Sequence, residues 1–168
     1  MSADEIVHQL LSPYSSIGPQ IVQLLGREIV KGDTFDRKAI AKKVFNQKEL
    51  LTALELLLHP AVLEEIEIHY EQIKNQSKYP LFIAEIPLLY EIESAHLFDT
   101  VIAVVANRET AKKRFLACTD HPEEEFEKRM THQMPLTQKS AQADFTLTND
   151  GTLAELEHQV DTLFQQLT

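Results

Sequence analysis

Two short apolar runs decide the fold class of this chain: Leu81-Phe82-Ile83-Ala84-Glu85 and Thr100-Val101-Ile102-Ala103-Val104-Val105. Both runs are continuous rather than alternating, which is typical of strands that are buried on both faces of a parallel sheet. Helical patterns and a further strand pattern follow the second run, so the sequence predicts an α/β fold with a parallel sheet. We expect these helices at 108–117, 123–133 and 152–167, and the last strand at 145–148.

The residues before these runs have the apolar spacing of helices. Two short helices are expected at 6–11 and 17–25, and Asp36 is placed to cap a third at 37–45. Asn46 is placed to cap a fourth helix, which should end at His59-Pro60, where proline resets the pattern and a new helix follows. The chain therefore reads as one domain over 1–168. Its parts are a helical region at about 5–78, a sheet core at about 79–113 and 143–168, and a helical excursion at about 114–142.

Composition limits the partners and the compartment. Twenty-six acidic residues against sixteen Lys and Arg give a net charge of −10, which argues against nucleic acid and anionic membrane surfaces as partners. The single cysteine, Cys118, permits no intramolecular disulfide and favours a reducing compartment, so we expect a cytoplasmic protein. No apolar run approaches the ~18 residues of a membrane span. The chain also lacks the pattern of a signal peptide at its start.

Two carboxylates stand where strands meet helices. Asp4 lies between a strand end and a helix, at the edge of a parallel sheet where ligands usually bind, and it could accept a hydroxyl proton. The alternative is that Asp4 only caps a helix beginning near Glu5. Glu85 ends its strand as an acid that holds a Mg²⁺ shell would, and Pro87 then starts a helix. A strand that ends in an acid is common, so this signal alone is weak.

Basic residues gather on the expected helices of the second half, at Lys112, Lys113, Arg114, Arg129 and Lys139. Such residues would suit neutralisation of a phosphoryl group during its transfer, with exclusion of water. The alternative is ordinary solvated surface, which is the commoner fate of Lys and Arg on helices. The pair His59-Pro60 is equally ambiguous, because a histidine before a helix-breaking proline is more often structural than catalytic.

No phosphate-binding loop is present in the 168 residues. Such a loop has the form G-x-x-x-x-G-K-[ST], because its backbone N–H groups and its lysine must cradle the phosphates. The glycines stand as Gly18-Pro19, Gly26-Arg27, Gly32-Asp33 and Gly151-Thr152, so even the Gly-Lys dipeptide is absent.

Taken together and in order, five segments resemble the dephospho-coenzyme A kinase family across nearly the whole chain. The resemblance implies a P-loop kinase-like fold with a helical substrate region and a helical lid at about 114–142. It also implies transfer of phosphate from ATP, with Mg²⁺, to the ribose 3′-hydroxyl of dephospho-coenzyme A, the last step of coenzyme A synthesis. The segments are Ala3-Asp4, Leu57-Leu58-His59-Pro60-Ala61-Val62, Glu85-Ile86-Pro87-Leu88-Leu89-Tyr90-Glu91, Phe98-Asp99 with 101–105, and Ala143-Asp144 with Asn149-Asp150-Gly151.

The same resemblance implies a role for each matching residue. Asp4 matches the family's general base, and Glu85 matches the acid near Mg²⁺, acting through water. Arg114 and Arg129 match arginines that face the ATP phosphates. Asn149 lies in the segment near the adenine, and His59 and Pro60 belong to the substrate side.

Departures from the family pattern weaken the metal and lid roles. Ser2 stands where the family commonly has an aspartate, and Cys118 stands where it has a second basic residue. The missing loop would also remove a central strand, which lies in the family between the strands at 81–85 and 100–105. We therefore expect roughly 25 to 30 further residues before Met1, the length of a strand–loop–helix unit. Two alternatives remain: a pseudoenzyme that binds dephospho-coenzyme A or an adenine nucleotide without turnover, and a non-enzymatic interaction module.

Overall fold

The computed structural model describes residues 1–45, 47–76, 78–119 and 122–168. The chain divides into two compact units, Met1–Pro87 and Leu88–Thr168, and each is described by itself. Asn46, the expected cap of a helix, lies outside the described residues. Within the described residues, no helix has the length and apolar character needed to cross a membrane.

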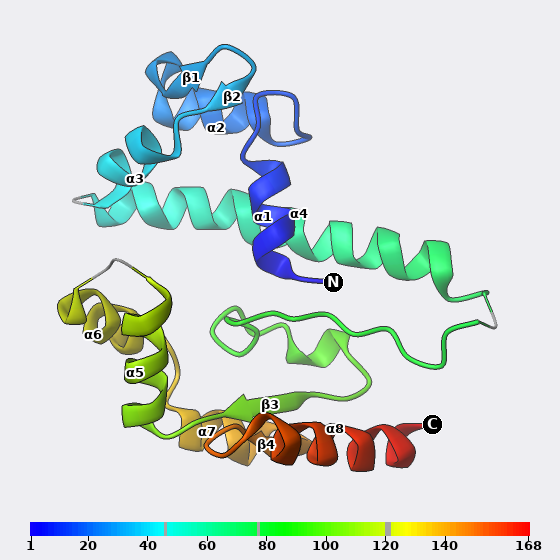
Figure 1. Ribbon diagram of the computed structural model, residues 1–168. Helices are drawn as coiled ribbons and strands as arrows, with labels where there is room; N and C mark the ends of the chain where they lie inside the picture. The colour runs from blue at the N-terminus through cyan, green and yellow to red at the C-terminus, as the bar shows by residue number, and fades with distance from the viewer. Residues whose placement is uncertain (46, 77, 120–121) are drawn as a thin grey trace. The chain divides into compact units, whose positions relative to one another are not determined.

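The first unit is built on the long helix α4 (Lys48–Ile73), against which α1 (Ala3–Leu10), α2 (Gly18–Leu25) and α3 (Arg37–Phe45) pack (Figure 1). The expected helices at 6–11, 17–25 and 37–45 are thereby confirmed. Their apolar faces form the core, and Ile21 and Ile29 within it are wholly inaccessible to solvent. The core residues of this unit are Ala3, Ile6, Leu10, Ile21, Leu25, Ile29, Phe35, Ile40, Leu54, Leu58, Ala61, Val62 and Ile66.

Helix α4 does not stop at Pro60, so the expected break there is wrong. The buried residues Leu54, Leu58 and Ile66 recur on one face on both sides of the proline, and this face carries the packing. Pro60 itself is exposed. The hydrogen bond that proline cannot donate is therefore lost on the solvent side, where water can satisfy the orphan carbonyl group.

A small hairpin between α2 and α3 was not predicted. After the short 3₁₀ turn η1 (Arg27–Ile29), strand β1 (Val30–Lys31) pairs antiparallel with β2 (Thr34–Phe35). Gly32 in the connecting two-residue turn has φ of 58°, a conformation that glycine adopts without steric cost. Asp36 then caps α3 as expected, because its Oδ1 accepts from the backbone N–H groups of Lys38 and Ala39 at 3.0 and 3.1 Å.

The stretch at 81–85 runs beside the start of the chain but does not form the expected buried strand. Only Glu85 makes a bridge, which is parallel and pairs with Ser2, and Ile83 is 62% exposed. The stretch forms no ladder within the described residues of its unit, and strands that are buried on both faces belong to a sheet with helices over both faces. The predicted parallel direction is nevertheless confirmed at Ser2 and Glu85.

The second unit contains a parallel pair of strands, β3 (Ile102–Val105) and β4 (Phe145–Thr148), in register from Ile102↔Phe145 to Val105↔Thr148. This confirms both expected strands and their direction. The burial of β3 differs from the prediction, because Ala103 is buried whereas Val104 on the other face is 58% exposed. Helix α7 packs on β3 and α8 on β4 (Figure 1). The helical elements are η2 (Ala95–Leu97), α5 (Arg108–Cys118), α6 (Glu123–His132), α7 (Leu136–Gln142) and α8 (Leu153–Leu167).

Helices α5, α6 and α8 confirm the predicted ones, whereas α7 was missed. The helix expected after Pro87 is a single turn, in which the N–H of Ile92 donates to the carbonyl of Leu88 at 3.0 Å. That turn ends in a Schellman motif. The N–H of Ser94 donates to Leu89 and the N–H of Glu93 to Tyr90, and Glu93 has φ of 55°.

The outer edge of β4 is closed by a side chain. The N–H of Thr148 donates to Oε1 of Gln159 at 2.9 Å, and Nε2 of Gln159 donates to the carbonyl of Thr148 at 2.9 Å. Gln159 lies on α8, so this pair of bonds also fixes the helix against the strand. The inner edge pairs with β3, where the N–H of Asn149 donates to the carbonyl of Val105 at 2.7 Å.

Candidate functional site

In the first unit the start of the chain forms one edge of the candidate site. The N–H of Glu85 donates to the carbonyl of Met1 at 2.8 Å, and the N–H of Ala3 donates to the carbonyl of Glu85 at 2.9 Å. The terminal ammonium of Met1 donates to the carbonyl of Ile83 at 3.0 Å. Two parallel segments therefore end side by side, and ligands usually bind at such carboxyl ends.

Asp4 lies just beyond this edge, in the first turn of α1. The helix begins at Ala3 and Ser2 occupies the N-cap position, so the alternative in which Asp4 caps a helix near Glu5 is wrong. The Asp4 carboxylate is exposed. Its backbone is fixed by the helix while its oxygens face solvent, which suits a group that must receive a proton.

Glu85 lies at the same edge, because the bridge to Ser2 places it directly beside the residue that precedes α1. Its side chain is exposed, and its backbone N–H and carbonyl are both held by the start of the chain. The structure thus brings together two of the predicted site residues, Asp4 and Glu85, at this edge of the parallel pair. The two carboxylates form the rim of the candidate site. Among the described residues, no group of three or more His, Cys, Asp and Glu side chains could hold a metal ion.

His59 and Pro60 lie midway along α4, the helix on which α1 packs. His59 is half-buried and Pro60 is exposed. The same unit therefore carries the two rim carboxylates and the predicted substrate residues.

In the second unit Arg114 and Asn149 meet. One terminal nitrogen of the Arg114 guanidinium donates to the carbonyl of Asn149 at 2.6 Å, and Asn149 follows the last residue of β4. Helix α5 leaves the carboxyl end of β3 and thereby brings Arg114 to the end of the neighbouring strand. Two residues predicted separately thus form one contact at the carboxyl ends of the parallel pair.

Two further residues hold this junction together, and they were not predicted from the sequence. Asn107 caps α5 by accepting from the N–H of Thr110 at 2.8 Å, and its own N–H donates to the carboxylate of Asp150 at 2.6 Å. The loop after β3 is therefore tied to the turn after β4. The sequence signal was an Asn three residues before a helical Thr, which is an ordinary cap pattern.

Arg129 lies on α6 and not at this junction. Its guanidinium carbon is 5.3 Å from the centre of the Phe115 ring on α5, and its Nε is 3.6 Å from the carboxylate of Glu125, one turn earlier. Arg129 is 53% exposed, so this long ion pair contributes little. The contact with Phe115 nevertheless holds the guanidinium group of Arg129 against α5.

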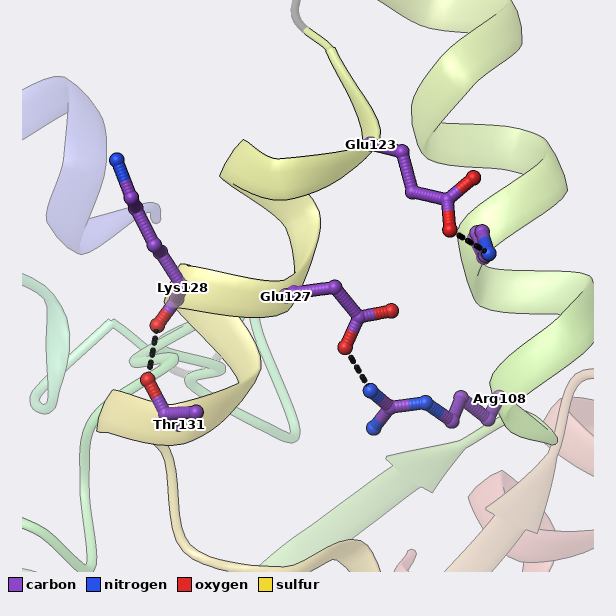
Figure 2. A network of polar contacts seen from close by, with 6 residues as sticks. Arg108, Glu123, Glu127, Lys128 and Thr131 are labelled. Atoms are coloured by element: carbon purple, nitrogen blue, oxygen red, sulfur yellow. Dashed lines mark hydrogen bonds and ion pairs between the residues drawn. The ribbon is translucent and has the colours of Figure 1, made fainter.

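Ion pairs join α5 to α6 (Figure 2). Arg108 pairs with Glu127, and Lys112 pairs with Glu123, so two basic residues of α5 face two acids of α6. The hydroxyl of Thr131 donates to the carbonyl of Lys128 at 2.7 Å in the same view. Lys112, one of the basic residues that could either neutralise a phosphoryl group or be ordinary surface, is thus engaged by an acid. These pairs could not be predicted from local pattern, because they depend on how the two helices are placed.

Parallel strands with helices leaving their carboxyl ends, a carboxylate rim and an arginine at a second strand end are typical of an α/β protein of the P-loop kinase-like type. A profile described as "Dephospho-CoA kinase" matches residues 1–155. The chain therefore belongs to the dephospho-CoA kinase family, which confirms the resemblance and its activity class, a kinase transferring phosphate to an alcohol.

The similarity to related proteins extends along almost the entire chain. The dephospho-CoA kinase of Protochlamydia amoebophila is 45% identical, with 99% of this chain and 83% of that protein covered, and that of Chlamydia muridarum is 44% identical with the same coverage. Among solved structures, TT1252 from Thermus thermophilus has a TM-score of 0.79 at 28% identity, covering 100% of this chain and 84% of its own. Dephospho-CoA kinase from Campylobacter jejuni has a TM-score of 0.71 at 25% identity, covering 99% and 83%.

Proposed function

We propose that the chain phosphorylates the 3′-hydroxyl of dephospho-coenzyme A with ATP, and that the rim formed by Asp4 and Glu85 is the centre of this reaction. The observation that carries the proposal is the backbone pairing of Met1 and Ala3 with Glu85, which puts both carboxylates at the end of one parallel pair. Phosphoryl transfer needs positioning and charge neutralisation more than covalent chemistry. A rigid rim with two exposed acids supplies the positioning.

Asp4 is the proposed general base. As the 3′-oxygen attacks the γ-phosphorus, its proton passes to the Asp4 carboxylate, the bond from phosphorus to the bridging oxygen breaks, and ADP leaves. A base for this step must be ionised and must reach the hydroxyl group. The exposed position in the first turn of α1 meets the second need, because solvent-facing oxygens can approach a substrate.

Glu85 is the proposed acid near Mg²⁺, acting through a bound water. Mg²⁺ binds oxygen ligands, retains several waters and is usually held by one or two carboxylates together with substrate phosphates. The rim offers exposed carboxylate oxygens, which are the kind of ligand that Mg²⁺ takes. When bound, Mg²⁺ supplies positive charge that offsets the charge developing on the phosphates.

ATP is proposed to be bound by Arg114, Arg129 and Asn149. Arg114 uses one nitrogen for the Asn149 carbonyl, which leaves the other donors of its planar group for a phosphate. Arg129 is half-exposed, and its guanidinium group lies over the Phe115 ring. The region at about 114–142 acts as the lid in this proposal, and Asn149 lies beside the adenine.

The helical region at about 5–78 is the proposed binding region for dephospho-coenzyme A, with His59 and Pro60 on the substrate side. Helix α4 joins this region to the rim, because α1 packs against it. We propose a cytoplasmic location, supported by the single exposed thiol of Cys118.

The test compares Asp4→Asn with Glu5→Gln, a matched change at the next residue, which is also exposed. It uses the protein isolated from its own cells, whose intact mass and N-terminal peptide first identify the chain under assay. Transfer of radiolabelled phosphate from ATP to dephospho-coenzyme A is the readout. We expect Asp4→Asn to lower kcat by about 10²- to 10⁴-fold and Glu5→Gln to leave it unchanged.

Three outcomes would contradict parts of the proposal. Equal activity of Asp4→Asn and the unmodified protein would remove the general-base role. A calorimetric signal for dephospho-coenzyme A without turnover by the unmodified protein would indicate a pseudoenzyme. Neither binding nor turnover would leave the interaction module as the remaining alternative.

A further inference from the structure

The second unit holds an enclosed ion pair that the proposed reaction does not use. Nζ of Lys139 lies 2.9 Å from Oε1 of Glu91, and the two side chains are only 12% and 17% exposed. Each of the other ion pairs in the described residues has one side chain that is more than half exposed. A buried pair costs desolvation, and breaking it by removing one partner is strongly destabilising. Its position in the fold therefore needs a reason.

One oxygen of Glu91 serves two contacts. The same Oε1 also accepts from the backbone N–H of Met134 at 2.7 Å. Met134 lies two residues after the end of α6, and Lys139 lies within α7. A single carboxylate thus binds both the exit of α6 and the helix that follows it.

The Glu91 side chain is itself firmly placed. It belongs to the turn after Pro87, which the Schellman motif at Glu93 and Ser94 closes. Its second oxygen, Oε2, is buried and has no hydrogen-bond partner within the described part of the chain. A buried acceptor without a hydrogen-bond partner destabilises the folded state, and such groups are rare in native proteins.

The far end of this connection is fixed to the sheet. Helix α7 packs on β3, and Asp144, just after α7, accepts from the N–H of Val101 at 2.8 Å through its carboxylate. The N–H of Asp144 donates to the carbonyl of Val101 at 3.0 Å. The exit of α6 is therefore held between the turn at Glu91 and a helix anchored on β3.

We propose that Glu91 is a positioning residue: by holding the Met134 backbone and Lys139, it sets the exit of α6 and so the place of Arg129, five residues before Met134. The inference rests on the proposed role of Arg129 toward ATP. Misplacement of a binding group by about 1 Å can cost 10²-fold in rate. A change at Glu91 should therefore reduce catalysis through Arg129, although Glu91 touches no substrate.

The experiment is a double-mutant cycle between Glu91 and Arg129 in the full-length active protein. Glu91→Ala removes both contacts, whereas Glu91→Gln keeps an oxygen that can accept from Met134 and loses the charge facing Lys139. Arg129→Ala removes the residue that is positioned. Glu157→Ala, an exposed glutamate on α8, is the matched control. Each variant is assayed well below its own thermal midpoint, and kcat, KM for ATP and ATP affinity by calorimetry are measured.

We expect Glu91→Ala to lower kcat/KM for ATP about 10- to 100-fold and Glu91→Gln to have a smaller effect. Both effects should nearly vanish in the Arg129→Ala background, because groups that act as a unit are not additive. A drop of equal size in both backgrounds, or no drop for either Glu91 variant, overturns the inference alone. If Arg129→Ala leaves kcat/KM and ATP affinity unchanged, the proposed role of Arg129 fails, and the inference fails with it. If Glu91→Ala does not fold, the Glu91→Gln cycle decides by the same criterion.

Discussion

Glu93 is the one non-glycine residue with positive φ in the described part of the chain, and its replacement by glycine should stabilise the protein. A φ of 55° puts Glu93 in the left-handed region, where an L-residue with a Cβ costs about 1–2 kcal/mol. Glycine avoids this cost but loses about 0.5–1 kcal/mol more chain entropy on folding. The difference predicts that Glu93→Gly raises the free energy of unfolding by about 0.5–1 kcal/mol. The side chain is exposed, so little else is lost.

The assay is urea unfolding followed by far-ultraviolet circular dichroism, because the chain contains no tryptophan. Glu93→Ala separates the two causes, since it removes the carboxylate but keeps the Cβ, and it should bring no gain. Glu157→Gly, in the exposed middle of α8, should lose about 1 kcal/mol, as glycine does in an ordinary helix. The reasoning is refuted if Glu93→Gly is no more stable than Glu93→Ala while the slopes of the unfolding curves agree.

Further predictions follow from single contacts. Pro60→Ala should raise thermal stability by up to about 3 kcal/mol, since Pro60 interrupts a continuous helix; an unchanged midpoint would contradict this. Gly18→Ala should cost about 1–3 kcal/mol, because its Cβ would lie 2.5 Å from the carbonyl oxygens of Ser12 and Pro13; calorimetry measures the loss. Asn107→Ala should cost about 1 kcal/mol and speed hydrogen exchange at the Thr110 amide. Burial raises the pKa of Glu91, but the hydrogen bonds from Lys139 and Met134 outweigh it and lower the pKa. The stabilisation from the Glu91 carboxylate is therefore fully present at pH values above its ordinary pKa of 4.5, and it is lost as the pH falls through the lower pKa of the folded state. The difference in unfolding free energy between the unmodified protein and Glu91→Gln should therefore shrink in acid.

The helices and the parallel direction of the strands were predictable from local pattern. Regular apolar spacing fixed α1, α2 and α3, and continuous apolar runs fixed β3 and its direction relative to β4. The predicted break at Pro60 was wrong because it considered only the local cost of proline. The buried face of α4 continues past Pro60, and its packing keeps the helix continuous. The run at 81–85 misled it because burial depends on neighbouring strands, which the run itself does not encode.

The candidate site was predicted in part. Asp4 and Glu85 share an edge because each lies at or just after the end of a parallel segment, whereas Arg114 meets Asn149 because helix α5, which follows β3, carries it to the end of β4. The pairing of Glu91 with Lys139 could not be predicted. These residues are far apart in sequence, and only the packing of the turn after Pro87 against α7 brings them together.

The contact between Gln159 and Thr148 has a consequence for how copies of the chain meet. An edge strand normally offers its outward N–H and carbonyl groups to any passing strand, and this is a common start of aggregation. The Gln159 amide supplies both a donor and an acceptor to Thr148, as a further strand would. At this residue the sheet therefore has no open place for a strand from another molecule, and a side chain of α8 protects the protein from edge-to-edge association beside Asn149.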